Sequence, residues 1–141
     1  MAALLRMSEA TTLGLHAGIL VAEAEGPVSA AQMAGTLDAS EAHLAKVLQS
    51  LTRAGLLRSK RGPKGGYVLA RAASEISLLD VYESLEGKLP LTDCLFERKR
   101  CDRAQCILGG LIESVRTQIG DYLGSTSLRD AMSSHHPAER S

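Results

Sequence analysis

The sequence predicts a mainly α-helical fold with one small β-hairpin, in which a winged helix-turn-helix precedes a long C-terminal helix. The 141 residues include one Phe, three Tyr and no Trp. The core must therefore consist of aliphatic side chains, a composition that favours helices over a sheet sandwich. Apolar residues recur at helical spacing in successive segments. A Gly- and Pro-rich stretch at 61–66 separates two short segments of strand character and predicts the hairpin.

A first helix is expected up to about Glu25, where Gly26-Pro27 follows as a stop signal. A second, shorter helix begins after Ser29. Ser29 and Gln32 have the spacing of a capping box, in which each side chain accepts a hydrogen bond from the backbone amide at the other position.

A third helix follows the turn at 38–40 and ends at Gly55, a residue that suits the left-handed conformation closing many helices. Two helices joined by such a turn form a helix-turn-helix. The core-facing stripe of the third helix is aliphatic and consists of Leu44, Val47, Leu48 and Leu51. The opposite face is left for solvent or a DNA major groove and carries Glu41, Ala42, His43, Ala45, Lys46, Gln49 and Arg53.

The hairpin after the third helix has the position of a wing, whose cations would meet DNA phosphates or a minor groove. The whole chain has zero formal net charge, yet Ala42 to Ser74 contains no acid and seven basic residues. This block predicts a phosphate-binding face, and charge alone leaves an ordinary solvated surface as the alternative. The expected contacts to double-stranded DNA are Ser40, Ala42, His43, Lys46, Arg53, Arg58, Lys60, Arg61, Gly62, Lys64 and Gly65.

A fourth helix is predicted from Ser77, with Asp80 as its capping partner, to Gly87. Residues 88–106 show no periodicity. A fifth helix then carries an apolar stripe that is too long for a solvent-exposed surface: Leu108, Leu111, Ile112, Val115, Ile119, Tyr122 and Leu123. We expect a dimerisation helix, and packing on its own domain is the alternative.

The predicted organisation has a DNA-binding domain at 1–87, a cysteine-containing loop at 88–106, a dimerisation helix with a C-terminal segment at 107–132 and a disordered tail at 133–141. The N-terminus lacks the pattern of a signal peptide, and no apolar stretch approaches membrane-spanning length. A cytoplasmic protein without a membrane partner is expected. In that reducing compartment, an odd number of cysteines argues against a purely structural disulfide framework.

Gaps of six and four residues separate Cys94, Cys101 and Cys106. These gaps match neither a zinc ribbon nor the common ferredoxin patterns. Three thiolates on one loop can hold an iron-sulfur cluster if a fourth ligand comes from elsewhere, or they can sense thiol oxidants directly. No catalytic triad, carboxylate pair or phosphate-binding glycine loop indicates an enzyme. The alternatives from other classes are a small metalloenzyme or metal carrier that uses the cysteines, and an interaction module whose basic wing binds an acidic partner.

The segment SEAHLAKVLQSLTRAGLLRSKRGPKGGYVLARAASEISLLDVYESLEG resembles the Rrf2 family of bacterial winged-helix regulators, and the likeness extends to about Met132. Its most specific parts are Arg61-Gly-Pro-Lys-Gly-Gly-Tyr67 and Ile76-Ser-Leu-Leu-Asp-Val81. The resemblance implies a homodimeric transcription regulator on a roughly palindromic operator. It also implies an iron-sulfur cluster, of 2Fe-2S or 4Fe-4S type, that senses redox, nitric oxide or iron status.

The resemblance also suggests a fourth ligand. Members that regulate iron-sulfur assembly use a His three positions after the last cysteine, where this chain has Gly109. In the NsrR-like branch an acid near the N-terminus of the partner subunit has this role, and Glu9 is at the matching place. The implied metal ligands are therefore the three cysteines and Glu9, for which an ordinary first-turn acid is the alternative. Ala45 replaces a Glu that tunes site choice in assembly regulators, so different DNA sites are expected.

Overall fold

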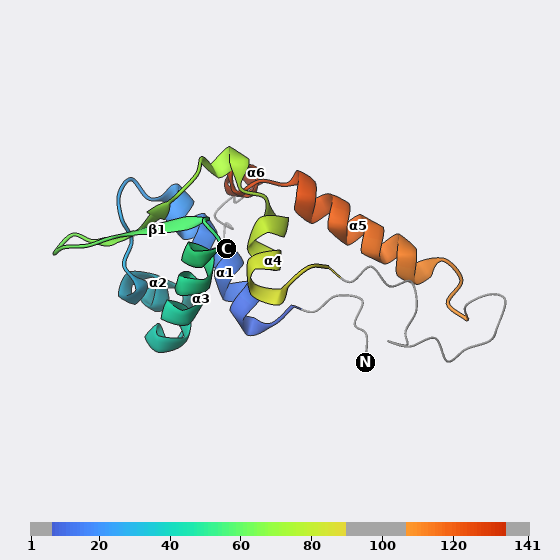
Figure 1. The fold of residues 1–141 in the computed structure, drawn as a ribbon, viewed down its shortest axis with the longest axis horizontal. Helices are drawn as coiled ribbons and strands as arrows, with labels where there is room; N and C mark the ends of the chain where they lie inside the picture. Colours follow the sequence, from blue (N-terminus) through green and yellow to red (C-terminus); the bar gives the residue numbers. More distant parts are fainter. Residues whose placement is uncertain (1–6, 90–106, 135–141) are drawn as a thin grey trace, which may run out of the picture.

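The structure is a computed structural model, and it describes residues 7–89 and 107–134 (Figure 1). The described part is mainly helical with one antiparallel hairpin, so the predicted fold class is confirmed. Its elements are α1 (Glu9–Glu23), α2 (Ala30–Leu37), α3 (Glu41–Arg53), β1 (Leu57–Lys60), β2 (Gly66–Leu69), the 3-10 helix η1 (Ala73–Glu75), α4 (Leu78–Glu86), α5 (Leu111–Ser125) and α6 (Leu128–Ser134).

The helix ends follow the predicted capping signals. Ser29 and Gln32 form a reciprocal capping box at the start of α2, and Ser77 and Asp80 form another at the start of α4. Helix α3 ends before Gly55, which has a φ of 80°. These ends depend on hydrogen bonds between residues a few positions apart, which is why the sequence predicts them.

Helix α1 lies at the centre of the fold, where it contacts α2, α3, α4, α6 and β2. The core around it is aliphatic, and all the residues predicted to form the inner stripe of α3 are buried in it. Gly14 allows α4 to approach α1 closely, because a Cβ at this position would collide with the side chain of Leu85. Helix α3 also packs against α1, and this contact sets its position.

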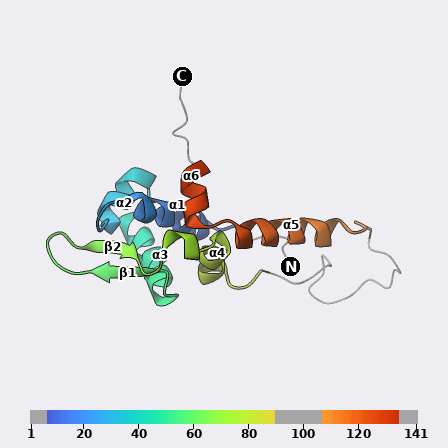
Figure 2. The same cartoon turned by 90° about the horizontal axis from the view of Figure 1, so that it is seen from above.

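The hairpin projects from this core (Figure 2). Strand β1 pairs antiparallel with β2, with Leu57 opposite Leu69. Val28, between α1 and α2, adds a bridge to the other edge of β2: its N–H donates to the Tyr67 carbonyl (3.1 Å) and its carbonyl accepts from the Tyr67 N–H (2.8 Å). This bridge attaches the base of the hairpin to the helical core.

Helix α5 extends away from the core (Figure 1), but its C-terminal end is bonded to the start of α4. The Leu78 N–H donates to the Thr126 carbonyl (2.8 Å), and the Leu128 N–H donates to the Ile76 carbonyl (2.9 Å). The chain then turns into α6, which packs on α1 and η1. Leu128 is buried in the core of the DNA-binding domain.

Helices α4 and α6 begin with the same pattern, Ser-Leu-x-Asp, and the two patterns pair through the bridge between Ser77 and Ser127. At α6 the Ser127 N–H donates to the Asp130 carboxylate (3.0 Å), and the Asp130 N–H donates to the Ser127 hydroxyl (3.1 Å). Hydrogen bonds from the Ser127 backbone and then from its side chain hold the pKa of Asp130 below its usual value.

The predicted segment 107–132, a dimerisation helix with a C-terminal segment, contains two helices with different surroundings. Helix α5 begins at Leu111, and α6 joins the core of the N-terminal domain and extends to Ser134, beyond the predicted start of the tail. Residues 1–6, 90–106 and 135–141 lie outside the described residues. None of the helices described has the length and apolar character needed to cross a membrane.

Replacing Gly66 by Ala should destabilise the hairpin. A Cβ there would lie 2.6 Å from the backbone carbonyl of Val28, and the φ of 155° is unfavourable for an L side chain. We expect the free energy of unfolding to fall by about 2 kcal/mol or more in urea titrations. The control is Gly35→Ala in α2, where a Cβ has open space. This change should raise stability by about 0.5–1 kcal/mol, because Ala is the better helix former. Equal losses in both variants would contradict the bridge to Val28.

Candidate nucleic-acid interface

Helix α3 exposes the face that was predicted to meet DNA. Its first residue is preceded by Ser40, whose hydroxyl accepts a hydrogen bond from the His43 N–H (3.3 Å). Ala42, Lys46 and Arg53 are exposed, and His43 is half-buried. Since the opposite face of α3 is buried, these side chains are presented on a helix that packing holds in place.

The hairpin tip is a tight turn that directs cations outward. The Gly65 N–H donates to the Gly62 carbonyl (2.9 Å), and Gly62 has a φ of 110°. A Cβ on Gly65 would collide with the Lys60 carbonyl oxygen, so only glycine fits the turn. Arg61 precedes this turn, Lys64 lies within it, and both cations are exposed.

The structure brings the two predicted contact regions together. Helix α3 packs against β1, and the pair lies at the end of the molecule opposite the projecting end of α5 (Figures 1 and 2). Gly65 and His43 are half-buried and the other predicted contact residues are exposed. The two regions therefore form one basic surface, which we call the α3–hairpin surface and which consists of Ser40, Ala42, His43, Lys46, Arg53, Arg58, Lys60, Arg61, Gly62, Lys64 and Gly65.

One cation of the acid-free block does not belong to this surface. The Arg71 guanidinium lies 3.7 Å from the Asp80 carboxylate in α4. Within residues 7–89 and 107–134, no ion pair involves the basic residues of the α3–hairpin surface. Its positive charge is therefore not neutralised by neighbouring acids of the described chain.

Gln49 is a candidate contact that the sequence-based set omitted. It is exposed on α3 between Lys46 and Arg53. Helical spacing had already placed it on the outer face. An amide side chain at this position can donate and accept hydrogen bonds at base edges in a major groove.

The predicted oxygen ligand, Glu9, is exposed in the first turn of α1. The adjacent Ser8 N–H donates to Glu86 Oε1 (2.9 Å), and the hydroxyl of the fully buried Thr11 donates to the same oxygen (2.6 Å). Glu86 is the last residue of α4, from which the chain continues toward the cysteines. Glu9 therefore lies at the end of α1 that is hydrogen-bonded to the end of α4.

The predicted ligands Cys94, Cys101 and Cys106 lie outside the described residues. Within the described ranges, no group of three or more His, Cys, Asp or Glu side chains is placed to hold a metal ion. His16 does not belong to such a group: it is exposed, and its Nδ1 lies 2.7 Å from the Thr12 carbonyl oxygen of the same helix.

The apolar stripe of α5 is divided between two surroundings. Ile112 and Leu123 are only 2% and 8% exposed within the single chain. Leu111 and Tyr122 are 52% and 64% exposed, and Val115 between them is half-buried. One side of the stripe therefore packs within the chain, and the other side is free to contact a second molecule.

A recognition helix and a basic hairpin on a helical core define a winged helix-turn-helix protein. The sequence profile of the Rrf2 family, described as an iron-dependent transcriptional regulator, matches residues 7–134. The chain belongs to the Rrf2 family. It is a DNA-binding transcription regulator and not an enzyme.

The relatives include two kinds of named regulator. CymR of Bacillus subtilis is 33% identical over 77% of this chain and 75% of CymR. Its structure, described as that of the global cysteine regulator, has a TM-score of 0.79 and covers 94% of this chain and 99% of CymR. T. potens IscR is 29% identical, with a TM-score of 0.74 over 97% and 93% of the two chains. An oxidised form of Staphylococcus aureus CymR is 29% identical, with a TM-score of 0.70 over 91% and 96%.

Proposed function

We propose that this regulator is a homodimer that binds a roughly palindromic operator through the α3–hairpin surface, and that the state of Cys94, Cys101 and Cys106 sets its affinity. The observation that carries the proposal is the exposed basic surface whose cations have no acidic partner within the described residues. The proposed location is the cytoplasm, where thiols stay reduced.

The two parts of the surface have different tasks in this proposal. Helix α3 enters the major groove, where Lys46 and Gln49 reach base edges. Arg61 and Lys64 at the hairpin tip contact backbone phosphates, which orient the protein without reading sequence. Because Gly65 fixes the turn and the bridge to Val28 fixes the hairpin base, little conformational entropy is lost when these cations bind.

The exposed side of α5 supplies the dimer contact. Leu111, Val115 and Tyr122 follow one another at helical spacing on that side, and α5 extends away from the core (Figure 1). Apolar residues on a projecting helix bury their surface when a second copy packs against them. A two-fold dimer repeats α3 with the same symmetry, which matches a palindromic operator.

The donor set fits an iron-sulfur cluster. Thiolates are the ligands such clusters use, and Glu9, exposed in the first turn of α1, supplies a carboxylate that in the proposed dimer would reach across from the partner subunit. Cys94, Cys101, Cys106 and Glu9 would hold the cluster, which supplies a centre reactive toward oxidants and nitric oxide. The iron-dependent description of the family and the similarity to IscR support this form of the proposal.

The alternative is a cluster-free regulator whose cysteines sense thiol oxidants directly. The similarity to CymR, which has been solved in an oxidised form, supports it. Both forms share the DNA surface and the dimer, so metal content separates them.

Arg61→Gln and Lys64→Gln should each weaken binding to duplex DNA of any sequence. Each lost phosphate contact should lower the slope of log affinity against log salt by about 0.9. Fluorescence anisotropy over a salt series measures both quantities. Arg71→Gln is the matched control, since Arg71 belongs to the same basic block but pairs with Asp80. An unchanged slope in both tip variants would contradict the proposed wing contact.

Tyr122→Glu should convert the dimer to a monomer, because it places an unpaired charge in the proposed contact at a cost of several kcal/mol. Light scattering at micromolar concentration gives the mass. Thr117→Glu adds the same charge at an exposed position on another side of α5 and should leave the dimer intact. A monomeric parent protein would refute the dimer and the palindromic operator together.

Protein purified without oxygen should contain iron and sulfide, and Cys101→Ala should lose most of the visible absorbance of the cluster, because a strong ligand is removed. Glu9→Ala should retain a more labile cluster, since water can replace a weak oxygen ligand.

Removing the cluster should change operator affinity by about tenfold, which corresponds to about 1.4 kcal/mol of coupling. Iron-free protein whose affinity responds to thiol oxidation would favour the alternative, and equal affinities in all states would contradict both forms.

A further inference from the structure

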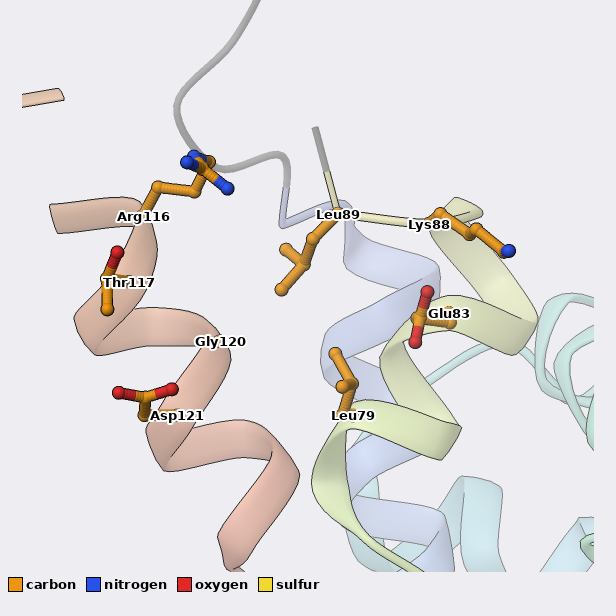
Figure 3. A pocket seen from close by; sticks show the side chains of 8 residues that line it. All are labelled: Leu79, Glu83, Lys88, Leu89, Arg116, Thr117, Gly120 and Asp121. Carbon is orange, nitrogen blue, oxygen red and sulfur yellow. The ribbon is translucent and has the colours of Figure 1, made fainter. Parts of the chain in front are cut away.

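A hollow of about 370 Å³ lies between α4 and α5 (Figure 3). This volume is in the range of pockets that bind small molecules. One wall comes from α4 and the residues after it, and the other wall comes from α5. The lining residues are Leu79, Glu83, Lys88, Leu89, Arg116, Thr117, Gly120 and Asp121.

The middle of the hollow is apolar. Leu79 and Leu89 point into the gap between the helices, opposite Gly120 (Figure 3). A Cβ on Gly120 would lie 3.7 Å from Leu89 Cδ1, in ordinary van der Waals contact. The hollow therefore exists because α5 has a glycine at this point, and a larger side chain there would fill it.

Arg116 contributes a donor that the described residues leave unsatisfied. Its side chain is half-buried, and its Nε atom is buried without a hydrogen-bond partner in residues 7–89 and 107–134. An N–H group that is buried without a partner is unfavourable in free energy. Since a guanidinium bonds most strongly to an anionic oxygen, Arg116 in the wall of the hollow favours a ligand with a carboxylate.

The other charges of the hollow limit what that ligand is. Arg116 and Lys88 are positive, whereas Glu83 and Asp121 are negative, and no ion pair joins any two of them within the described chain. A simple anion would meet two attractive and two repulsive charges. A ligand with both a carboxylate and an ammonium group matches both signs, and the leucines match an apolar stem.

We propose that this hollow binds a small α-amino acid with an apolar side chain. The ligand's carboxylate bonds to Arg116, its ammonium group pairs with Glu83 or Asp121, and its side chain lies against Leu79 and Leu89. The ligand touches both α4, which packs on α1 and α3, and the projecting α5. Its presence fixes the angle between these parts and so alters the spacing of two recognition helices, a consequence that rests on the proposed dimeric DNA binding.

Titration calorimetry of the full chain with L-leucine and L-methionine tests the binding directly. For ligands of this size we expect a Kd at or below about 1 mM. The matched probes are 4-methylpentanoate, which lacks the ammonium group, and 3-methylbutylamine, which lacks the carboxylate. Each should bind at least about tenfold more weakly, a difference of about 1.4 kcal/mol. No saturable binding of either amino acid at about 10 mM, or equal binding of the half molecules, would overturn the proposal.

Variants place the binding in this hollow. Arg116→Gln removes the charge and Gly120→Leu fills the space, and both should abolish the leucine signal. Ser114→Leu is the control, because residue 114 is an exposed position of α5 outside the hollow. Thermal midpoints without ligand show that each variant is folded, and the double change Glu83→Gln with Asp121→Asn replaces any variant that is not. Undiminished binding in the folded variants would overturn the assignment.

DNA affinity measured with and without leucine separates the two proposals. A shift that disappears in Gly120→Leu supports regulation through the hollow. Leucine binding without any shift overturns the regulatory consequence and leaves the binding site established. A parent protein that binds leucine but no duplex DNA contradicts the proposed function and leaves the amino-acid site intact.

Discussion

The close packing of neighbouring helices on the small residues of α1 is the constraint on which the rest of the structure depends. Gly14 faces side chains of α3 and α4, with Val47 Cγ1 3.5 Å from a Cβ placed there, and Gly18 faces Leu128 of α6 at 3.5 Å from such a Cβ. Ala17, on the same face, is fully buried. Larger residues at these positions would push the helices apart and would move α3 relative to the hairpin.

This packing links the end of α4, which precedes the proposed sensing segment in the sequence, to the DNA surface. Glu86 bonds the start of α1 to the end of α4, at the point where the chain departs toward the cysteines. Ser8 already caps α1 through its own hydroxyl, which accepts the Thr11 N–H at 3.2 Å. Glu86 is therefore not needed to begin the helix, and its effect is to tie α1 to α4. A displacement at the end of α4 would reach α3 through α1 by direct contact.

Helix α5 is attached to the core at its C-terminal end and is exposed at its N-terminal end. Its C-terminal end is clamped where the paired Ser-Leu-x-Asp patterns meet, whereas its N-terminal end projects from the core. Gly120 and Gly124 face leucines of the α4 side, and the hollow between α4 and α5 interrupts this contact. A helix that is fixed at one end and separated from its neighbour by a hollow along part of its length can change its angle at low cost in free energy.

The amino-acid sequence determined the local features of this protein. The capping boxes at Ser29 and Ser77, the glycine end of α3 and the buried stripe of that helix were predicted correctly, because each depends on hydrogen bonds or periodicity within a few residues. The basic block and the family were also evident from the sequence. The identity of the cluster ligands stays a prediction, because the cysteines lie outside the described residues.

Only the tertiary structure decided the features that join distant segments. It placed α6 in the core of the N-terminal domain, divided the α5 stripe into buried and exposed sides, and paired Arg71 with Asp80. It also brought Glu86 to the start of α1, across 78 positions of sequence. Periodicity states which face of a helix is apolar but not what covers that face, because the covering element comes from elsewhere in the chain. The hollow between α4 and α5 has no sequence signal for the same reason.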